Sequence, residues 1–116
     1  GQGYYRQKIR EKWNYKCPVT GCEILSILIS SHILPWSESN HSERLDVENG
    51  ILLSPDVDSL FDKHLISFTN DGELVLSNRI TKEHLKKLGI PTDVKIPISE
   101  GMKKYLNKHR EITING

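Results

Sequence analysis

Apolar residues near the start of the chain recur at every fourth position, with polar and basic residues between them. This spacing predicts a helix over residues 4–15 with one apolar stripe, made of Tyr5, Ile9 and Trp13. A turn that contains proline and glycine follows over 16–23. Residues 24–33 are mostly aliphatic, and the β-branched side chains near the end of that run predict a buried strand over 29–33.

The polar stretch after this strand has no apolar period, so we predict an irregular loop over residues 35–50. A loop of that length in a compact domain is usually functional or mobile. Asn49 and Gly50 form a turn signal, and the aliphatic residues after them predict a short strand over 51–53. The two short strands and the loop would form a distorted hairpin.

A helix is predicted directly after the second strand. Ser54 suits its N-cap and Pro55 its first position, and the helix would cover residues 55–63. Three of its apolar side chains would face inward, Val57, Leu60 and Phe61. A second hairpin and two more helices complete the pattern, over 65–68 with 73–77, over 81–88 and over 99–111. The predicted fold class is α+β, in a single domain over residues 1–116.

The composition fits one globular domain and argues against a disordered or membrane-spanning protein. The chain has 116 residues, of which 36% are hydrophobic and 27% charged, which is not the signature of disorder. No apolar run approaches the roughly 20 residues that span a bilayer, so we expect no membrane partner. The chain does not begin with Met, and we expect it to be a piece cut from a longer protein.

The net charge of +1 hides a segregation along the chain. Residues 1–16 hold five basic residues and one acidic residue, and residues 101–116 hold four basic and one acidic. Residues 37–73 hold nine acidic residues and two basic ones. Basic ends can bind a polyanion and an acidic middle can bind a divalent cation, although a solvated, salt-bridged surface explains the charges equally well.

Two cysteines, Cys17 and Cys22, are separated by four residues. A structural zinc site usually has four ligands from paired Cys-x-x-Cys units, and the chain has no second pair. We expect two reduced structural thiols, with a zinc-stabilised interaction domain as the alternative.

The residues that suggest chemistry lie on the predicted hairpin and on the helix after it. His32 ends the first strand, Asn49 precedes the second, and Asp58 and Asp62 lie one turn apart on one face of the helix. A neutral imidazole can deprotonate a water, and an ion held by the carboxylates can stabilise charge on a phosphate. We therefore expect His32 and Asp58 to face one pocket.

Several linked motifs in this order resemble the HNH endonucleases, most of all the nuclease domains of bacterial restriction enzymes. The central stretches are residues 17–21, 31–36, 49–55 and 58–62. The flanks are also similar, with 1–6 resembling the family's first helix, 66–68 and 71–72 its second hairpin, and 105–110 its closing helix. The resemblance thus extends over nearly the whole chain.

This resemblance implies a ββα-metal core, with flanking helices and a second hairpin, that cleaves DNA with one divalent metal. By position, His32 matches the general base and Asn49 the residue that braces the hairpin loop and orients that base. Asp58 matches the metal ligand and Asp62 a further ligand. Carboxylates favour Mg²⁺ or Mn²⁺, and Zn²⁺, Ni²⁺ or Ca²⁺ would be substitutes in crystals.

One departure from the family pattern leaves a second function open. Many members have Asp or His as a metal ligand just before the base, and this chain has Ser31 there. A hydroxyl is a poor ligand, so substrate and water must complete the site. The alternative is a catalytically inactive HNH-fold module for DNA binding or assembly.

The expected partner is double-stranded DNA. Basic residues suited to phosphate contacts, which position a duplex without reading its sequence, are Arg6, Lys8, Arg10, Arg44 and Lys63. No recognition helix is evident, so target choice is expected from a separate domain of the parent protein. A homodimer would allow both strands to be cut, and a restriction or defence role implies the bacterial cytoplasm. Trp36 is expected to pack, and His109 with Arg110 to brace the fold.

Overall fold

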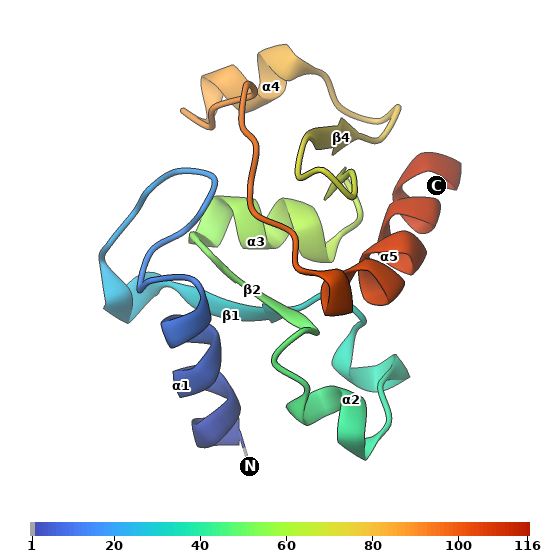
Figure 1. Cartoon of the computed structure of the whole chain (residues 1–116). Coiled ribbons are helices and arrows are strands. Elements are labelled where there is room, and N and C mark those ends of the chain that lie inside the picture. The colour runs from blue at the N-terminus through green and yellow to red at the C-terminus, as the bar shows by residue number, and fades with distance from the viewer. Residues whose placement is uncertain (1) are drawn as a thin grey trace.

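The computed structural model describes residues 2–116, so Gly1 of the first family-like motif lies outside the described residues. Five α-helices and two small antiparallel hairpins make up the regular structure of these residues, which confirms the predicted α+β class. The first hairpin lies between helices α1 and α3, and the second lies beside α5 (Figure 1). The first hairpin and α3 form a ββα unit, and the other helices surround it.

Helix α1 (Gln2–Lys12) packs its apolar stripe on the first hairpin. Tyr5, Ile9 and Trp13 are all buried, as the spacing predicts. The helix ends three residues before the predicted boundary because Asn14 and Tyr15 have φ values of 57° and 59°. Left-handed backbone cannot continue a right-handed helix.

The first hairpin pairs β1 (Ile29–His32) with β2 (Gly50–Leu53) in antiparallel register. Ile29 is opposite Leu53 and His32 is opposite Gly50, so His32 lies at the end where the connecting segment leaves the strand. All four β2 residues are buried, whereas β1 is partly exposed. The predicted hairpin is confirmed, one residue shorter in β1 and one longer in β2.

The prediction of an irregular loop over residues 35–50 is wrong. A 3₁₀ turn, η2 (Trp36–Glu38), and a short helix, α2 (His41–Leu45), occupy half of it. Asn40 and Glu43 form a reciprocal capping box at the start of α2, with both hydrogen bonds at 2.9 Å. Trp36, expected to pack, is 46% exposed.

Helix α3 (Pro55–Asp62) begins where Ser54 and Pro55 predict and buries Val57 and Phe61, with Leu60 partly buried. Ser54 has the extended backbone of an N-cap, but its side chain makes no capping hydrogen bond. Its hydroxyl lies instead 3.6 Å from Sγ of Cys17, which is buried as a free thiol. Hydrogen bonds from Thr20 and Ser54 outweigh the effect of burial and lower the pKa of Cys17.

The C-terminal half follows its predictions with shifted boundaries. Strands β3 (Ile66–Phe68) and β4 (Leu74–Leu76) pair antiparallel, and α4 (Lys82–Lys87) is capped by Thr81. A 3₁₀ turn, η3 (Glu100–Met102), precedes α5 (Lys103–Asn115), which packs on β3. The α5 residues predicted to brace the fold do so, because His109 contacts Ser67 Oγ at 2.9 Å and the Phe61 carbonyl at 2.8 Å.

Gly50 permits the closest approach between α1 and the hairpin. A methyl group on Gly50 would collide with the Tyr5 hydroxyl and the tip of Ile9, both in the buried stripe of α1. We expect Gly50→Ala to lower the free energy of unfolding by about 1–3 kcal/mol through overpacking, measured by urea denaturation. Gly3→Ala is the matched control, because a methyl group there meets nothing within 4 Å. Equal stability of the two variants would contradict the close approach.

Candidate functional site

His32 is held by two contacts that leave one ring nitrogen without a partner. Its ring stacks on Tyr5 at 4.4 Å with an interplanar angle of 7°. Its Nε2 lies 2.9 Å from the main-chain carbonyl of Arg44. Since a carbonyl only accepts hydrogen bonds, Nε2 carries the proton in the neutral ring. Nδ1 then holds a lone pair, and it makes no hydrogen bond with residues 2–116 and is not one of their buried unpaired atoms.

Tyr5 links this ring to the second strand. Its hydroxyl donates to the main-chain carbonyl of Asn49 at 2.7 Å, while its ring supports His32. Burial, followed by the negative charge of Asp46, raises the pKa of Tyr5 well above its usual value. The hydroxyl therefore stays protonated and remains a donor wherever the domain is folded. Sequence patterns identify Tyr5 only as a core residue, and they give no signal for this second role.

Asn49 joins both ends of the segment between the strands. Its Oδ1 accepts from the Leu34 amide at 2.8 Å, and its Nδ2 donates to the Glu43 carbonyl at 3.0 Å. Asn49 is fully buried, so these bonds are not in competition with water. Fixing Glu43 also fixes the neighbouring Arg44 carbonyl that receives His32. Asn49 thus braces the connection and indirectly orients the imidazole.

Asp58 and Asp62 are the candidate metal ligands on α3. Burial raises the pKa of Asp58 most, a hydrogen bond with the Ser31 side chain lowers it by less, and the charge of Asp62 adds a small increase. Asp58 is half-buried and Asp62 is exposed. Two carboxylates that repel each other on one face of a helix suit a divalent cation, which relieves that repulsion. Within residues 2–116, however, no three His, Cys, Asp or Glu residues form a ready-made metal group. The Ser31 hydroxyl, water and substrate oxygens would complete the coordination.

His32 and Asp58 do not share a pocket in this structure. Side chains of successive strand residues point to opposite faces, so Ser31 and His32 leave β1 in opposite directions. Ser31 is associated with Asp58 of α3, whereas His32 stacks on Tyr5 of α1. The two helices lie on either side of the hairpin (Figure 1). Only the thickness of one strand separates the two faces.

The five predicted phosphate-binding residues do not form a single patch. Arg6 is exposed on α1 and borders the same hollow as His32. Arg44 is half-buried, with its guanidinium 4.2 Å from the Trp36 ring centre. Lys63 is exposed at the end of α3, directly after Asp62. Lys8 pairs with Glu11 at 3.4 Å, and Arg10 has a buried Nε without a partner among the described residues.

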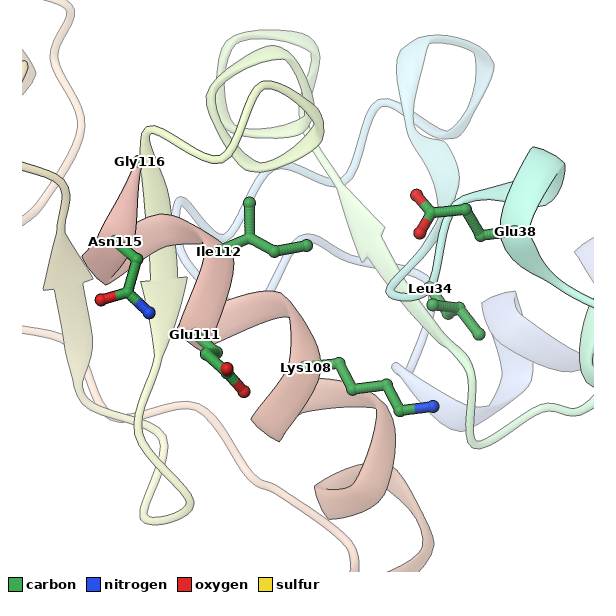
Figure 2. Close-up of a pocket in the computed structure, with 7 residues that line it drawn as sticks. All are labelled: Leu34, Glu38, Lys108, Glu111, Ile112, Asn115 and Gly116. Atoms are coloured by element: carbon green, nitrogen blue, oxygen red, sulfur yellow. The ribbon is translucent and has the colours of Figure 1, made fainter.

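A separate hollow is lined by none of the candidate site residues. Leu34 and Glu38 face Lys108 and Ile112 of α5 across a space of about 490 Å³ (Figure 2). Its lining contains no histidine or aspartate, so it offers neither a base nor the carboxylate pair. The candidate base and the candidate metal ligands lie instead on the hairpin and on α3.

The raised pKa of Asp58 has a consequence for stability. The folded state binds its proton more tightly than the unfolded chain does, so this group removes stability as pH rises from about 3.9, its usual unfolded value, through the folded pKa. Without added metal, we expect Asp58→Asn to melt at a higher temperature than the wild type near neutral pH. The difference should shrink as pH falls to about 4.

The measurement is thermal denaturation of both proteins across this pH range in EDTA. Asp93→Asn, which changes an exposed carboxylate outside the helices, is the control for a general charge effect. A lower melting temperature for Asp58→Asn near neutral pH would show that burial does not dominate at this residue.

Comparisons with known proteins identify the central part of the chain. Residues 17–69 match the family model described as HNH endonuclease. The matched segment contains β1, β2, α3 and β3, and with them His32, Asn49, Asp58 and Asp62. No curated protein matches the chain. No helix in residues 2–116 has the length and apolar character needed to cross a membrane. Residues 17–69, a little under half of the chain, are therefore an HNH domain of the kind found in HNH endonucleases.

Proposed function

We propose that this domain is a metal-dependent DNA endonuclease, with His32 as the general base that activates the attacking water. The single observation that carries the proposal is the fixed tautomer of His32. The Arg44 carbonyl holds the proton on Nε2 at 2.9 Å, and Nδ1 is left to accept a proton from water. The match of residues 17–69 to the HNH endonucleases supports a nuclease.

Proton transfer to Nδ1 would leave a positively charged imidazole. The Arg44 carbonyl then accepts a stronger, charge-assisted hydrogen bond from Nε2, which stabilises that form. The Tyr5 ring limits rotation of the imidazole by stacking on it at 4.4 Å. Water activated at Nδ1 attacks the phosphorus, and the bond to the leaving oxygen breaks.

Asp58 and Asp62 are proposed to hold one divalent cation, with Mg²⁺ or Mn²⁺ favoured by their oxygen ligands. The ion would supply charge neutralisation at the phosphate and at the leaving oxygen. Because Asp58 and His32 approach β1 from different faces, the scissile phosphate would lie at the edge of this strand. Support comes from the sheet itself, since β1 pairs with β2 alone among the described strands and keeps one edge unpaired.

The biological setting is proposed on the resemblance to restriction nucleases. Arg6, Arg44 and Lys63 would contact phosphates of double-stranded DNA and position it without reading its sequence. Target choice would come from another domain of a longer protein, and a homodimer would cut both strands. A restriction or defence role in the bacterial cytoplasm fits these features.

An inactive DNA-binding or assembly module is the second candidate. Ser31 favours it, because a hydroxyl stands where many HNH nucleases have a metal ligand, and it interacts with Asp58 instead. Such a module would keep the fold of the hairpin and α3 without the need for a cation.

Cleavage of plasmid DNA in Mg²⁺ or Mn²⁺ tests the catalytic role of His32. We expect His32→Ala to lower the cleavage rate by about 10²–10⁴-fold, because the proton acceptor is lost. His41→Ala removes an exposed histidine of α2 and should cleave at the wild-type rate. Thermal denaturation checks that both variants fold. Equal rates for His32→Ala and the wild type would exclude His32 as the base.

Calorimetric titration with Mn²⁺ separates the two candidate functions without relying on activity. A nuclease should bind about one ion per chain, and Asp58→Ala should abolish this binding because a main ligand is lost. Asp93→Ala should bind as the wild type does. An inactive module would give no binding that depends on Asp58.

A further inference from the structure

A second hollow borders His32. It measures about 480 Å³ and is formed by the N-terminal half of α1, by β1 and by the turn that contains Trp36. That volume lies within the range of small-ligand sites, about 300–1,000 Å³. Tyr5 and His32 line it beside the exposed Arg6, so a ligand in the hollow can contact the proposed base.

Trp36 has an aromatic surface that other residues cover only in part. It is 46% exposed, whereas Trp13 is 5% exposed and donates its indole N–H to the Gly50 carbonyl at 3.1 Å. The Arg44 guanidinium lies 4.2 Å from the Trp36 ring centre, and Arg44 Nε donates to the Trp36 carbonyl at 2.9 Å. Arg44 therefore holds Trp36 in one orientation, which reduces the entropy lost when a ligand stacks on it.

Trp36 is also tied to the candidate base. Its ring lies 5.8 Å from the His32 ring in an edge-to-face arrangement with an angle of 74°. The same Arg44 that holds the indole accepts the hydrogen bond from His32 Nε2 through its carbonyl. A group that stacks on Trp36 would thus be fixed relative to Nδ1 of His32.

One residue that lines the hollow, Ser30, carries an unsatisfied polar atom. Ser30 lies two residues before His32 on β1, so both side chains are on the same face of the strand. Its Oγ is buried and has no hydrogen-bond partner among residues 2–116, yet Ser30 lines the hollow. A buried hydroxyl without a partner is costly, and a ligand with polar atoms would satisfy it.

We propose that this hollow binds an unpaired nucleotide of the DNA substrate, with its base stacked on Trp36 and its phosphate between Arg6 and His32. The chemistry of the lining matches the parts of a nucleotide. A base can stack on an aromatic face, a guanidinium donates hydrogen bonds to a phosphate, and the unpaired Ser30 hydroxyl, once turned toward the hollow, can donate to or accept from the base or sugar edge. The inference rests on the proposed nuclease function and adds to it a preference among DNA substrates.

The preference follows from the stacking itself. In a continuous duplex both faces of each base are covered by its neighbours, so Trp36 can stack only on a base that has left the helix. The substrate bound here would therefore be single-stranded or gapped DNA, or a duplex with one base displaced beside the cleaved bond. Stacking on one aromatic residue tolerates any base, so it adds affinity without a sequence requirement.

Intrinsic fluorescence measures this contact, because Trp36 is the more exposed of the two tryptophans. The full chain is titrated in EDTA, so that no cleavage occurs. The three probes are a single-stranded DNA oligonucleotide, a duplex of the same sequence with a one-nucleotide gap in one strand, and the intact duplex. We expect quenching by the first two and little by the duplex. With excitation selective for tryptophan, Trp36→Phe should remove the quenching, since the buried Trp13 is then the sole tryptophan.

Anisotropy with labelled single-stranded DNA measures affinity without using tryptophan. Trp36→Ala should bind about tenfold more weakly, in line with the loss of one stacked base. Ile114→Ala, which removes a side chain that is 58% exposed on α5, should bind as the wild type does. Thermal denaturation of each variant confirms that it is folded.

The proposal is overturned if Trp36→Ala binds single-stranded DNA unchanged, if quenching persists in Trp36→Phe, or if the intact duplex quenches as strongly as the gapped DNA. None of these results bears on cleavage by His32, because binding is measured without metal.

Discussion

The hydrogen bond from the Tyr5 hydroxyl to the Asn49 carbonyl fixes the relation between the first helix and the hairpin. A buried hydrogen bond adds only about 0.5–1.5 kcal/mol to stability, but a buried carbonyl left without a donor costs about 1–3 kcal/mol. Burial also raises the pKa of Tyr5, so the donor is not lost by ionisation. The same residue supports His32 by stacking, so one side chain sets both the helix position and the base.

This contact leaves no room for a side chain at Gly50, where the connecting segment enters β2. The Tyr5 hydroxyl and the Ile9 tip occupy the space next to Gly50, and the Trp13 indole donates to the Gly50 carbonyl at 3.1 Å. Three residues of the apolar stripe of α1 therefore contact the same two backbone positions, Asn49 and Gly50. A side chain on Gly50 would separate α1 from β2, and the support for His32 would be lost with it.

Local signals account for the parts of the fold that the sequence predicts. The four-residue spacing in α1, the proline at the start of α3 and the glycine turns each act within a few neighbouring residues. Helix α2 was missed because its five residues are too few to show a period, although its Asn40 and Glu43 form a readable capping box. The Tyr5–Asn49 bond joins residues 44 positions apart, and no local pattern encodes such a contact.

The candidate site also has a part that the sequence predicts and a part that it does not. The order of His32, Asn49 and Asp58 could be identified from the sequence. The expectation that His32 and Asp58 face one pocket is not met, because side chains alternate between the two faces along β1. If Ser31 faces Asp58, His32 must face away from it, because adjacent strand residues point to opposite sides. Arg44 then becomes the residue that matters most on the His32 face. It contacts Trp36 twice and His32 once, so the nucleotide hollow and the base are held by one backbone segment, and moving either would move both.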